Sequence, residues 1–245
     1  MLSREEYEKI HKLCQESPQA AEIQKMLQKE NQLQLSMVSH EIRNPVTLIN
    51  SFLQLMASSH PEVKDFPYWQ DIMENMQFLR QLLASLSQYN NAWKLNREEA
   101  NLYLILKSFT EQLRPSLAKK RIAVEFFKES PIPPFLLDRD KLLQTFLNLI
   151  RNAAEAMDGQ GGTISITLSA DTDTAVIRFR DNGPGIPAAY LSTLFDFFVT
   201  HKKDGTGLGL AIARSTVEAH GGTIDVSSIE GQGAEFIIRL PVVYQ

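Results

Sequence analysis

Residues 39–45, Ser-His-Glu-Ile-Arg-Asn-Pro, lie inside a long stretch with helical periodicity. Apolar residues recur at that spacing around the segment, namely Val38, Ile42, Ile49, Phe52, Leu53 and Met56. This pattern predicts a helix with one face set for burial. At about 100° per residue, His40 lies about 200° from Val38 and from Ile42, so we expect its imidazole on the solvent side. Pro45 removes one backbone hydrogen bond and is expected to kink the helix just after the histidine.

An exposed helical histidine has two interpretations. Taken alone, His40 would be a solvated residue without a role. Glu41 follows it directly, and Asn44 lies one helical turn further on, where its side chain can lie near His40. The functional interpretation depends on the second half of the chain, which has the features of a nucleotide site.

Composition excludes several classes of protein. The chain has 245 residues, enough for one or two domains, and its net charge of −4 comes from interspersed charges. Without a long basic stripe, we expect no nucleic-acid partner. The single cysteine, Cys14, suits a reducing compartment. No apolar run approaches the roughly 18 residues of a membrane span, so we expect a cytoplasmic chain that makes no membrane contact itself.

The first half of the chain predicts a helical hairpin. Residues 1–20 form a polar segment that is broken at Ser17-Pro18, and residues 21–58 are helical in pattern. A second helix is expected from Tyr68 to Trp93, with a heptad seam of Ile72, Met76, Leu79, Leu83, Leu86, Asn90 and Trp93. Such a hairpin has too much apolar surface for one copy. We therefore expect residues 21–95 to be a dimerisation domain that forms a four-helix bundle with a second copy.

The pattern changes after Lys94–Glu99, a polar stretch that reads as a hinge or linker. Helices are expected at 102–118, 138–157 and 206–220, and Asp138 is the predicted N-cap of the second of them. Strands are expected at 121–127, 164–168, 175–180, 224–226 and 236–240. This order suggests a sheet with helices on one face. The whole chain is therefore predicted to be α+β, with residues 96–245 as the second domain.

Two glycine-bearing stretches lie in that second domain. Asp181-Asn-Gly183-Pro-Gly185 follows a strand directly, and a carboxylate at a strand end can accept a hydrogen bond from an adenine amino group. The alternative, a tight surface turn, would be favoured if this stretch stood alone. The second stretch, Gly205-Thr206-Gly207-Leu208-Gly209, opens a helix and can form an anion site. It is neither a Walker loop nor a Rossmann fingerprint.

Two asparagines add a candidate metal site. Asn148 and Asn152 lie one turn apart on one face of the predicted helix 138–157. Their amide oxygens can take Mg²⁺ that bridges nucleotide phosphates, because Mg²⁺ prefers a few oxygen ligands and keeps its waters. Asparagines at this spacing are otherwise usually solvated or capping. The two glycine stretches in the same domain favour the metal interpretation.

In this order, these motifs resemble those of two-component sensor histidine kinases. The resemblance covers about residues 21–245 and implies a histidine-phosphotransfer hairpin followed by a Bergerat-fold ATP-binding domain. The short lid and the Asn152–Met157 ending resemble sporulation-type kinases. The family also places a phenylalanine box at Leu194-Phe195-Asp196, which here continues Phe197-Phe198-Val199-Thr200-His201-Lys202 and so departs from the usual Pro-Phe-Phe-Thr-Thr-Lys. Lid packing is therefore expected to differ from that of relatives.

The resemblance implies a role for each motif residue. His40 would accept the phosphoryl group, Glu41 would take its proton, and ATP with Mg²⁺ would be held by the residues of the second domain. These are Asn148 and Asn152 for the metal, Asp181, Gly183 and Gly185 around adenine, and Lys202, Gly205, Thr206, Gly207, Leu208 and Gly209 around the phosphates. Glu155 stands where many relatives carry a lysine, which puts one phosphate contact in doubt. Related ATPases carry a catalytic glutamate at the position of Asn148; an amide cannot activate water, so bound ATP should be spared hydrolysis.

The expected activity is ATP-dependent autophosphorylation of His40 followed by transfer to an aspartate of a response regulator. Two alternatives remain at this point: a protein that works mainly as a phosphatase of its regulator, with Asn44 orienting water, and a non-enzymatic dimeric scaffold. The resemblance implies a homodimer through residues 21–95, a receiver-domain partner and an inhibitory protein as a candidate ligand of the hairpin. It also allows the chain to be the cytoplasmic part of a membrane-bound sensor.

Overall fold

The computed structural model describes residues 17–171, 173–200, 202 and 205–243. The chain divides into two compact units, Met1–Asn90 and Asn91–Gln245. This division lies close to the expected junction between residues 95 and 96. Most of the predicted N-terminal segment 1–20 lies outside the described residues.

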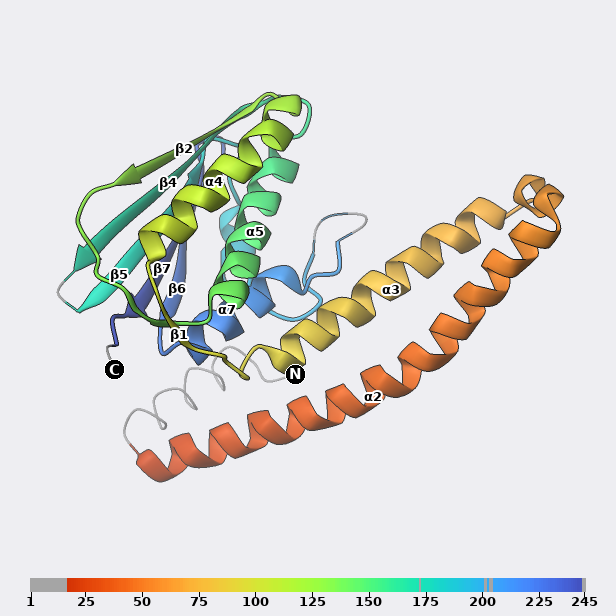
Figure 1. Ribbon diagram of the computed structural model, residues 1–245, viewed down its shortest axis with the longest axis horizontal. Helices are drawn as coiled ribbons and strands as arrows, with labels where there is room; N and C mark the ends of the chain where they lie inside the picture. Colours follow the sequence, from red (N-terminus) through yellow and green to blue (C-terminus); the bar gives the residue numbers. More distant parts are fainter. Residues whose placement is uncertain (1–16, 172, 201, 203–204, 244–245) are drawn as a thin grey trace. The chain divides into compact units, whose positions relative to one another are not determined.

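The first unit is a helical hairpin, as Figure 1 shows in red to yellow. Helix α2 (Pro18–Ser59) continues through Pro45, and a short 3₁₀ helix η1 (Pro61–Asp65) makes the turn to α3 (Trp69–Asn91). With 42 residues, α2 is about 63 Å long at 1.5 Å per residue. Pro61 is the first residue of η1, and Pro67 follows its end. Proline provides no donor for a continuing helix, and so the hairpin turns there.

Where the structure describes the side chains of the hairpin, each helix buries one strip against the other. Val46, Met76 and Leu83 form a small core, with Leu53 packed against it. The Arg43 guanidinium donates to the Leu83 carbonyl at 3.3 Å, which adds a polar link between the helices. Val38 and Ile42 are 52% and 45% exposed in the single chain, as expected of a hairpin with more apolar surface than one copy can bury. Two helices packed together can each cover only the strip that faces the other.

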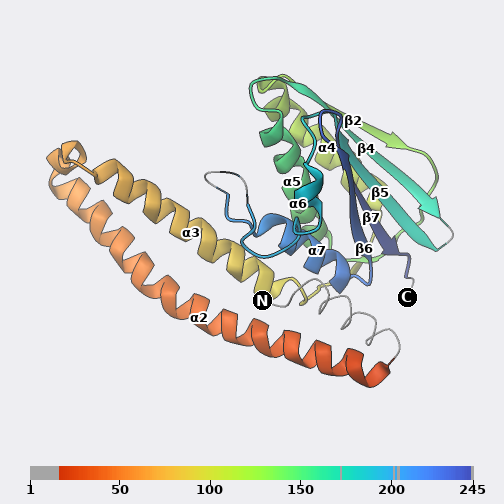
Figure 2. The same cartoon turned by 180° about the vertical axis from the view of Figure 1, so that it is seen from behind.

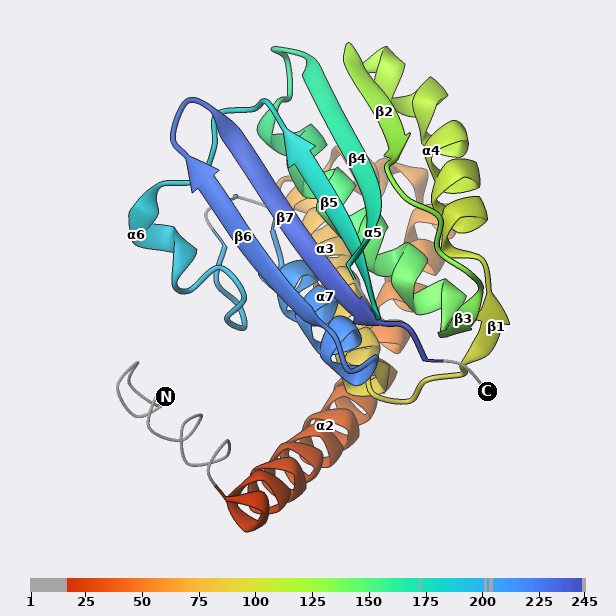
Figure 3. The same ribbon diagram turned by 90° about the vertical axis from the view of Figure 1, so that its left-hand side faces the viewer.

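The second unit is a five-stranded sheet with helices on one face (Figures 2 and 3). The strand order is β2-β4-β5-β7-β6; β2 pairs parallel with β4, and the other neighbours are antiparallel. The strands are β2 (Ile122–Lys128), β4 (Gly162–Asp171), β5 (Thr174–Asp181), β6 (Thr223–Ile229) and β7 (Gly233–Pro241). The covering helices are α4 (Leu102–Lys119), α5 (Arg139–Ala156) and α7 (Gly209–Ala219). The predicted α+β class is confirmed.

Four elements of this unit depart from the sequence prediction. The stretch expected as a linker contains β1 (Glu98–Ala100), which pairs antiparallel with β3 (Phe135–Leu137). A short helix α6 (Ala188–Leu191) follows the Asp181 turn. The helix expected from residue 206 begins only at Gly209, because the preceding residues belong to the loop. Strands of three residues carry too little periodicity to be recognised from sequence.

Aromatic contacts connect the helices to the sheet. The ring of Phe146 on α5 lies 6.1 Å from Phe109 of α4 and 5.3 Å from Phe179 of β5, measured between ring centroids. The predicted N-cap at Asp138 is confirmed, since its side chain accepts from the Lys141 N–H at 3.1 Å. These contacts fix α5, the helix that carries both candidate amides.

The start of the second unit is tied down by α5 and α7. The Lys141 ammonium donates to the carbonyls of Asn91, Ala92 and Lys94. The Asn96 N–H donates to the Asp138 carboxylate at 2.8 Å, and the Arg97 guanidinium donates to the Ala219 carbonyl at 2.9 Å. Residues 91–97 therefore belong structurally to the second unit.

No helix in the described ranges has both the length and the apolar character needed to cross a bilayer.

Candidate functional site

Two amides of α5 form one wall of the candidate site. Asn148 and Asn152 are both half-buried and lie one turn apart on α5. The Asn148 amide nitrogen donates to the Gly209 carbonyl at 3.2 Å, which orients its oxygen away from α7. The Asn152 oxygen accepts from the Lys202 ammonium at 3.2 Å. Hard amide oxygens fit Mg²⁺, and the described residues contain no cluster of three or more His, Cys, Asp or Glu side chains that could hold another metal.

The amino end of α7 forms the second wall. Its first residue, Gly209, is preceded by Leu208, which makes no side-chain cap. The first N–H groups of the helix therefore have no side-chain acceptor and can bind an anion. Leu208 itself is buried, so its side chain serves packing. The predicted anion site is thus placed beside the amides, with Thr206 half-buried in the preceding loop.

Glycine is required where this loop meets residues 198–200, which together with Lys202 are called the lid here. Gly207 has φ +65°, and a Cβ atom there would lie 2.5 Å from the carbonyl carbon of Phe198. The Phe198 N–H donates to the Gly207 carbonyl at 3.1 Å. At Gly205 a Cβ would lie 2.3 Å from the Thr200 hydroxyl oxygen. The glycines therefore let the phosphate loop pack directly on residues 198–200.

The phenylalanine box has one anchored ring and one exposed ring. Phe195 packs edge-to-face on Phe236 of β7, with centroids 6.4 Å apart, and the Arg214 guanidinium lies over its other side at 5.6 Å. Phe198 is 54% exposed and has φ +61°. Phe195 therefore anchors this segment to the sheet, whereas Phe198 does not.

Asp181 lies at the end of β5 and is buried. Its Oδ1 accepts from the N–H groups of Gly183, at 2.9 Å, and Ala234, at 3.4 Å. Both of these bonds reach Oδ1, so Oδ2 remains as an acceptor for a ligand.

Gly183 packs against Met157 at the end of α5, where a Cβ would lie 3.0 Å from the methionine Cγ. Gly185 packs equally closely on Ile229, where a Cβ atom would lie 2.3 Å from the carbonyl oxygen. The Asp181 turn is therefore packed between the end of α5 and the end of β6.

Burial raises the pKa of the Asp181 carboxyl, although the N–H bonds from Gly183 and Ala234 oppose this effect. We therefore predict that Asp181→Asn raises the thermal midpoint of the ligand-free protein near neutral pH by a few degrees. Asparagine keeps an oxygen for both N–H groups and removes the buried charge. The gain should shrink as the pH falls through the raised pKa of the folded protein and should vanish below the ordinary pKa of an aspartate, because the wild-type carboxyl is then neutral in both the folded and the unfolded state. Thermal unfolding across this pH range measures it, and a difference independent of pH contradicts the explanation.

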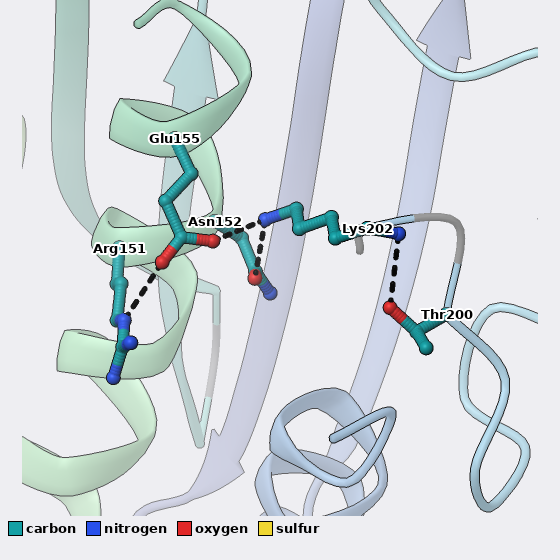
Figure 4. Close-up of polar contacts among 5 residues, drawn as sticks. All are labelled: Arg151, Asn152, Glu155, Thr200 and Lys202. Atoms are coloured by element: carbon teal, nitrogen blue, oxygen red, sulfur yellow. Dashed lines mark hydrogen bonds and ion pairs between the residues drawn. The ribbon is translucent and has the colours of Figure 1, made fainter. Parts of the chain in front are cut away.

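A cluster of five charged or polar residues, Arg151, Asn152, Glu155, Thr200 and Lys202, joins the lid to α5 (Figure 4). The Lys202 ammonium lies 2.5 Å from Glu155 Oε2, and the Arg151 Nε lies 2.8 Å from Glu155 Oε1. The Lys202 N–H also donates to the Thr200 hydroxyl at 3.2 Å. Burial of Glu155 favours its neutral form, but its bonds to Lys202 and Arg151 outweigh this and lower its pKa. The carboxylate is therefore charged and shared between two cations.

The structure thus brings together the residues predicted around the phosphates and the metal. Sequence reasoning missed Arg151 and Thr200, and it read Glu155 only as a lost phosphate contact. The spacing of Arg151 and Glu155, four residues apart on a helix, was a usable signal for their ion pair. No local signal connects Lys202 with Glu155.

His40 lies in the first unit and is exposed on α2, as are Glu41 and Asn44. The predicted solvent position of the imidazole is therefore confirmed. The buried neighbour is Ser39, which is 3% exposed. A histidine in this position is open to a second reactant.

Two family descriptions match the chain. Residues 30–91 match the His Kinase A (phospho-acceptor) domain, and residues 137–244 match the histidine kinase-, DNA gyrase B- and HSP90-like ATPases. The two matches fall in the first and second unit respectively, apart from Asn91.

Similar proteins cover most of this chain. The sensor histidine kinase ZraS of Escherichia coli O157:H7 is 34% identical over 206 residues, which are 84% of this chain and 45% of ZraS. Sporulation kinase C of Bacillus subtilis (strain 168) is 32% identical over 206 residues, 84% of this chain and 47% of that protein. The chain therefore spans about half the length of these relatives. A crystal structure of full-length ShkA in complex with AMPPNP superposes with a TM-score of 0.71 at 26% identity, covering 86% of this chain and 46% of ShkA.

Proposed function

This chain belongs to the sensor histidine kinases, and we propose that it transfers a phosphoryl group from ATP to His40 and then to an aspartate of a response regulator. The observation that carries the proposal is the convergence of the α5 amides, the uncapped start of α7 and the Lys202 ammonium in the second unit. Each of these groups is suited to a nucleotide phosphate or to its metal. The exposed His40 in the first unit supplies a nucleophile.

Adenine would be recognised at Asp181. Its Oδ2 is free to accept from an exocyclic amino group, and Gly183 and Gly185 leave no side chain above the turn. The triphosphate would lie along the loop from Gly205 to Gly209 and the N–H groups that open α7. This arrangement supports a nucleotide with its base at the end of α5 and its phosphates at the middle of that helix.

Asn148 and Asn152 would hold Mg²⁺ through their amide oxygens. Mg²⁺ in this position would neutralise charge on the phosphates. The Asn148 amide cannot act as a general base, so water is not activated at this position. This chemistry supports transfer to a protein nucleophile over hydrolysis of ATP.

His40 would attack the γ-phosphorus in line through a ring nitrogen, and ADP would leave as the bond between the γ-phosphorus and the bridging oxygen breaks. Glu41 follows it on the same exposed stretch of α2 and would accept the imidazole proton as general base. His40 and the nucleotide residues belong to different units, so the reaction requires His40 of one unit to reach the nucleotide held by the other. Because Lys141 and Asp138 hold residues 91–96 on the second unit, we place the hinge before residue 91.

A second copy of the chain would complete the hairpin. Met76 and Leu83, seven residues apart, are buried within one copy, whereas Ile72 and Leu79, from the other half of the heptad, are exposed. The exposed apolar side chains of α2 add to this surface: Met37, Val38, Ile42, Leu48, Ile49, Phe52, Leu55 and Met56. A four-helix bundle would bury both sets. We therefore propose a homodimer formed by residues 21–95.

We also propose a second function for the hairpin, the dephosphorylation of the regulator with the help of Asn44. It is exposed one turn after His40, where its amide could orient water toward a phosphoaspartate. The sporulation type of kinase also remains a proposal, supported by the likeness to sporulation kinase C.

Incubation of the purified chain with γ-labelled ATP and Mg²⁺ tests the proposed function. A phosphohistidine is labile to acid and stable to alkali, so label with these properties supports the kinase. Alkali-labile label or label on serine contradicts it, and binding of ATP without any label favours the scaffold. Addition of a purified receiver domain then measures transfer.

A further inference from the structure

The cluster around Lys202 has a feature that the proposed nucleotide site does not use. The Asn152 oxygen, one of the two atoms assigned to Mg²⁺, already accepts from the Lys202 ammonium at 3.2 Å (Figure 4). An ammonium ion and Mg²⁺ on the same oxygen would repel each other, so the two cations compete for it. Without a nucleotide, the Lys202 ammonium therefore occupies the Asn152 oxygen that is assigned to Mg²⁺.

Glu155 holds the ammonium in this place. Its Oε2 lies 2.5 Å from the Lys202 Nζ. Glu155 follows Asn152 by three residues on α5, so the two side chains are neighbours on one helix face. Arg151 binds the other carboxylate oxygen at 2.8 Å and fixes the orientation of the carboxylate. Two cations and one carboxylate leave the cluster with one net positive charge. The cluster can therefore still attract phosphate.

We propose that Glu155 is a positioning residue that keeps Lys202 on Asn152 until a nucleotide brings Mg²⁺ to the site. The proposal rests on the proposed function. Mg²⁺ must displace the Lys202 ammonium from the Asn152 oxygen. The displaced ammonium then becomes available to the phosphates. Glu155 thereby makes nucleotide binding less dependent on Mg²⁺ than the amides alone would make it.

The test is the magnesium dependence of AMPPNP affinity, defined as the Kd in EDTA divided by the Kd in Mg²⁺. Isothermal titration calorimetry with the full chain measures both constants. Glu155→Gln weakens the hold on Lys202, so this ratio should rise about two- to fivefold, the range for a partly exposed ion pair. The effect of charge alone has the opposite sign. Removal of a nearby carboxylate helps the more negative metal-free nucleotide more than it helps the Mg²⁺ complex, which lowers the ratio.

Two further variants separate these explanations. Lys202→Met removes the competing cation and should also raise the ratio. Glu155→Gln added to Lys202→Met should then give no further rise, because Glu155 acts through Lys202. The matched control is Asp225→Asn, which breaks an ion pair of the same 2.5 Å length with Arg239 on strands β6 and β7. It should leave the ratio unchanged.

An unchanged or lower ratio in Glu155→Gln overturns the proposal, as does a further rise in the double variant. If Glu155→Gln unfolds, Glu155→Asp tests the same competition, because it keeps the charge and shortens the side chain that reaches Lys202. Failure of the wild-type chain to bind AMPPNP would instead count against the proposed function. The two failures are therefore distinguishable.

Discussion

His40→Gln is expected to reduce phosphate incorporation to background while AMPPNP binding stays at the wild-type level. Glutamine keeps a polar side chain at an exposed helical position, so the variant should fold normally. It has no ring nitrogen to attack phosphorus. The proposed nucleotide contacts all come from the second unit, so the affinity for AMPPNP should not change.

His60→Gln is the matched control for this variant. His60 is also an exposed histidine of the first unit, where it contacts Glu62 at 3.1 Å. Its loss should leave acid-labile labelling unchanged. Labelling that persists in His40→Gln, or disappears in His60→Gln, contradicts the assignment of His40 as the phosphoacceptor. Denatured gels with [γ-³²P]ATP, run without acid fixation, provide the measurement.

Asn152→Ala is expected to weaken Mg²⁺-dependent AMPPNP binding and to stop labelling of His40. The variant removes one proposed metal oxygen and the acceptor of the Lys202 ammonium together. Loss of a group that supports a metal typically costs about 10- to 100-fold in affinity or activity. Most of the loss should appear in Mg²⁺ and little in EDTA, since the amide would act through the metal.

Asn75→Ala is the control for loss of a helical amide. Asn75 on α3 donates to the Asp71 carbonyl at 2.7 Å and lies in the other unit. It should bind AMPPNP and be labelled as the wild type is. Equal loss of affinity for Asn152→Ala in EDTA and in Mg²⁺ would remove Asn152 from the metal site. Thermal unfolding checks that both variants remain folded.

Much of the architecture was predictable from local sequence. The helices around His40 and the heptad, the N-cap at Asp138 and the alternating strands of the sheet were all expected at or near their observed places. Each depends on residues only a few positions apart, because helical and strand periodicities are set within a turn or a pleat. The site residues Asn148, Asn152 and Asp181 were also predicted as carriers of metal and adenine contacts. These assignments remain proposals about a ligand.

Burial was less predictable than periodicity. The sequence predicted an apolar stripe that one copy could not fully bury, but it did not show that Val46 would lie in the small core while Val38 and Ile42 stay exposed. Periodicity shows that a face is apolar, but it does not show which protein surface covers that face. The β1–β3 pair was missed for a related reason, since each strand has only three residues and is defined by its partner.

The sequence by itself determined the elements, the family resemblance and the exposed histidine. The tertiary structure decided which distant groups meet: Lys202 and Asn152, fifty residues apart in the chain, share one hydrogen bond, and Glu155 binds the same ammonium. It also decided that the carboxyl of Asp181 is buried and keeps one oxygen for a ligand. The physical reason is that these contacts depend on how α5, the lid and the sheet pack together. Side-chain packing between remote segments leaves no periodic signal along the chain.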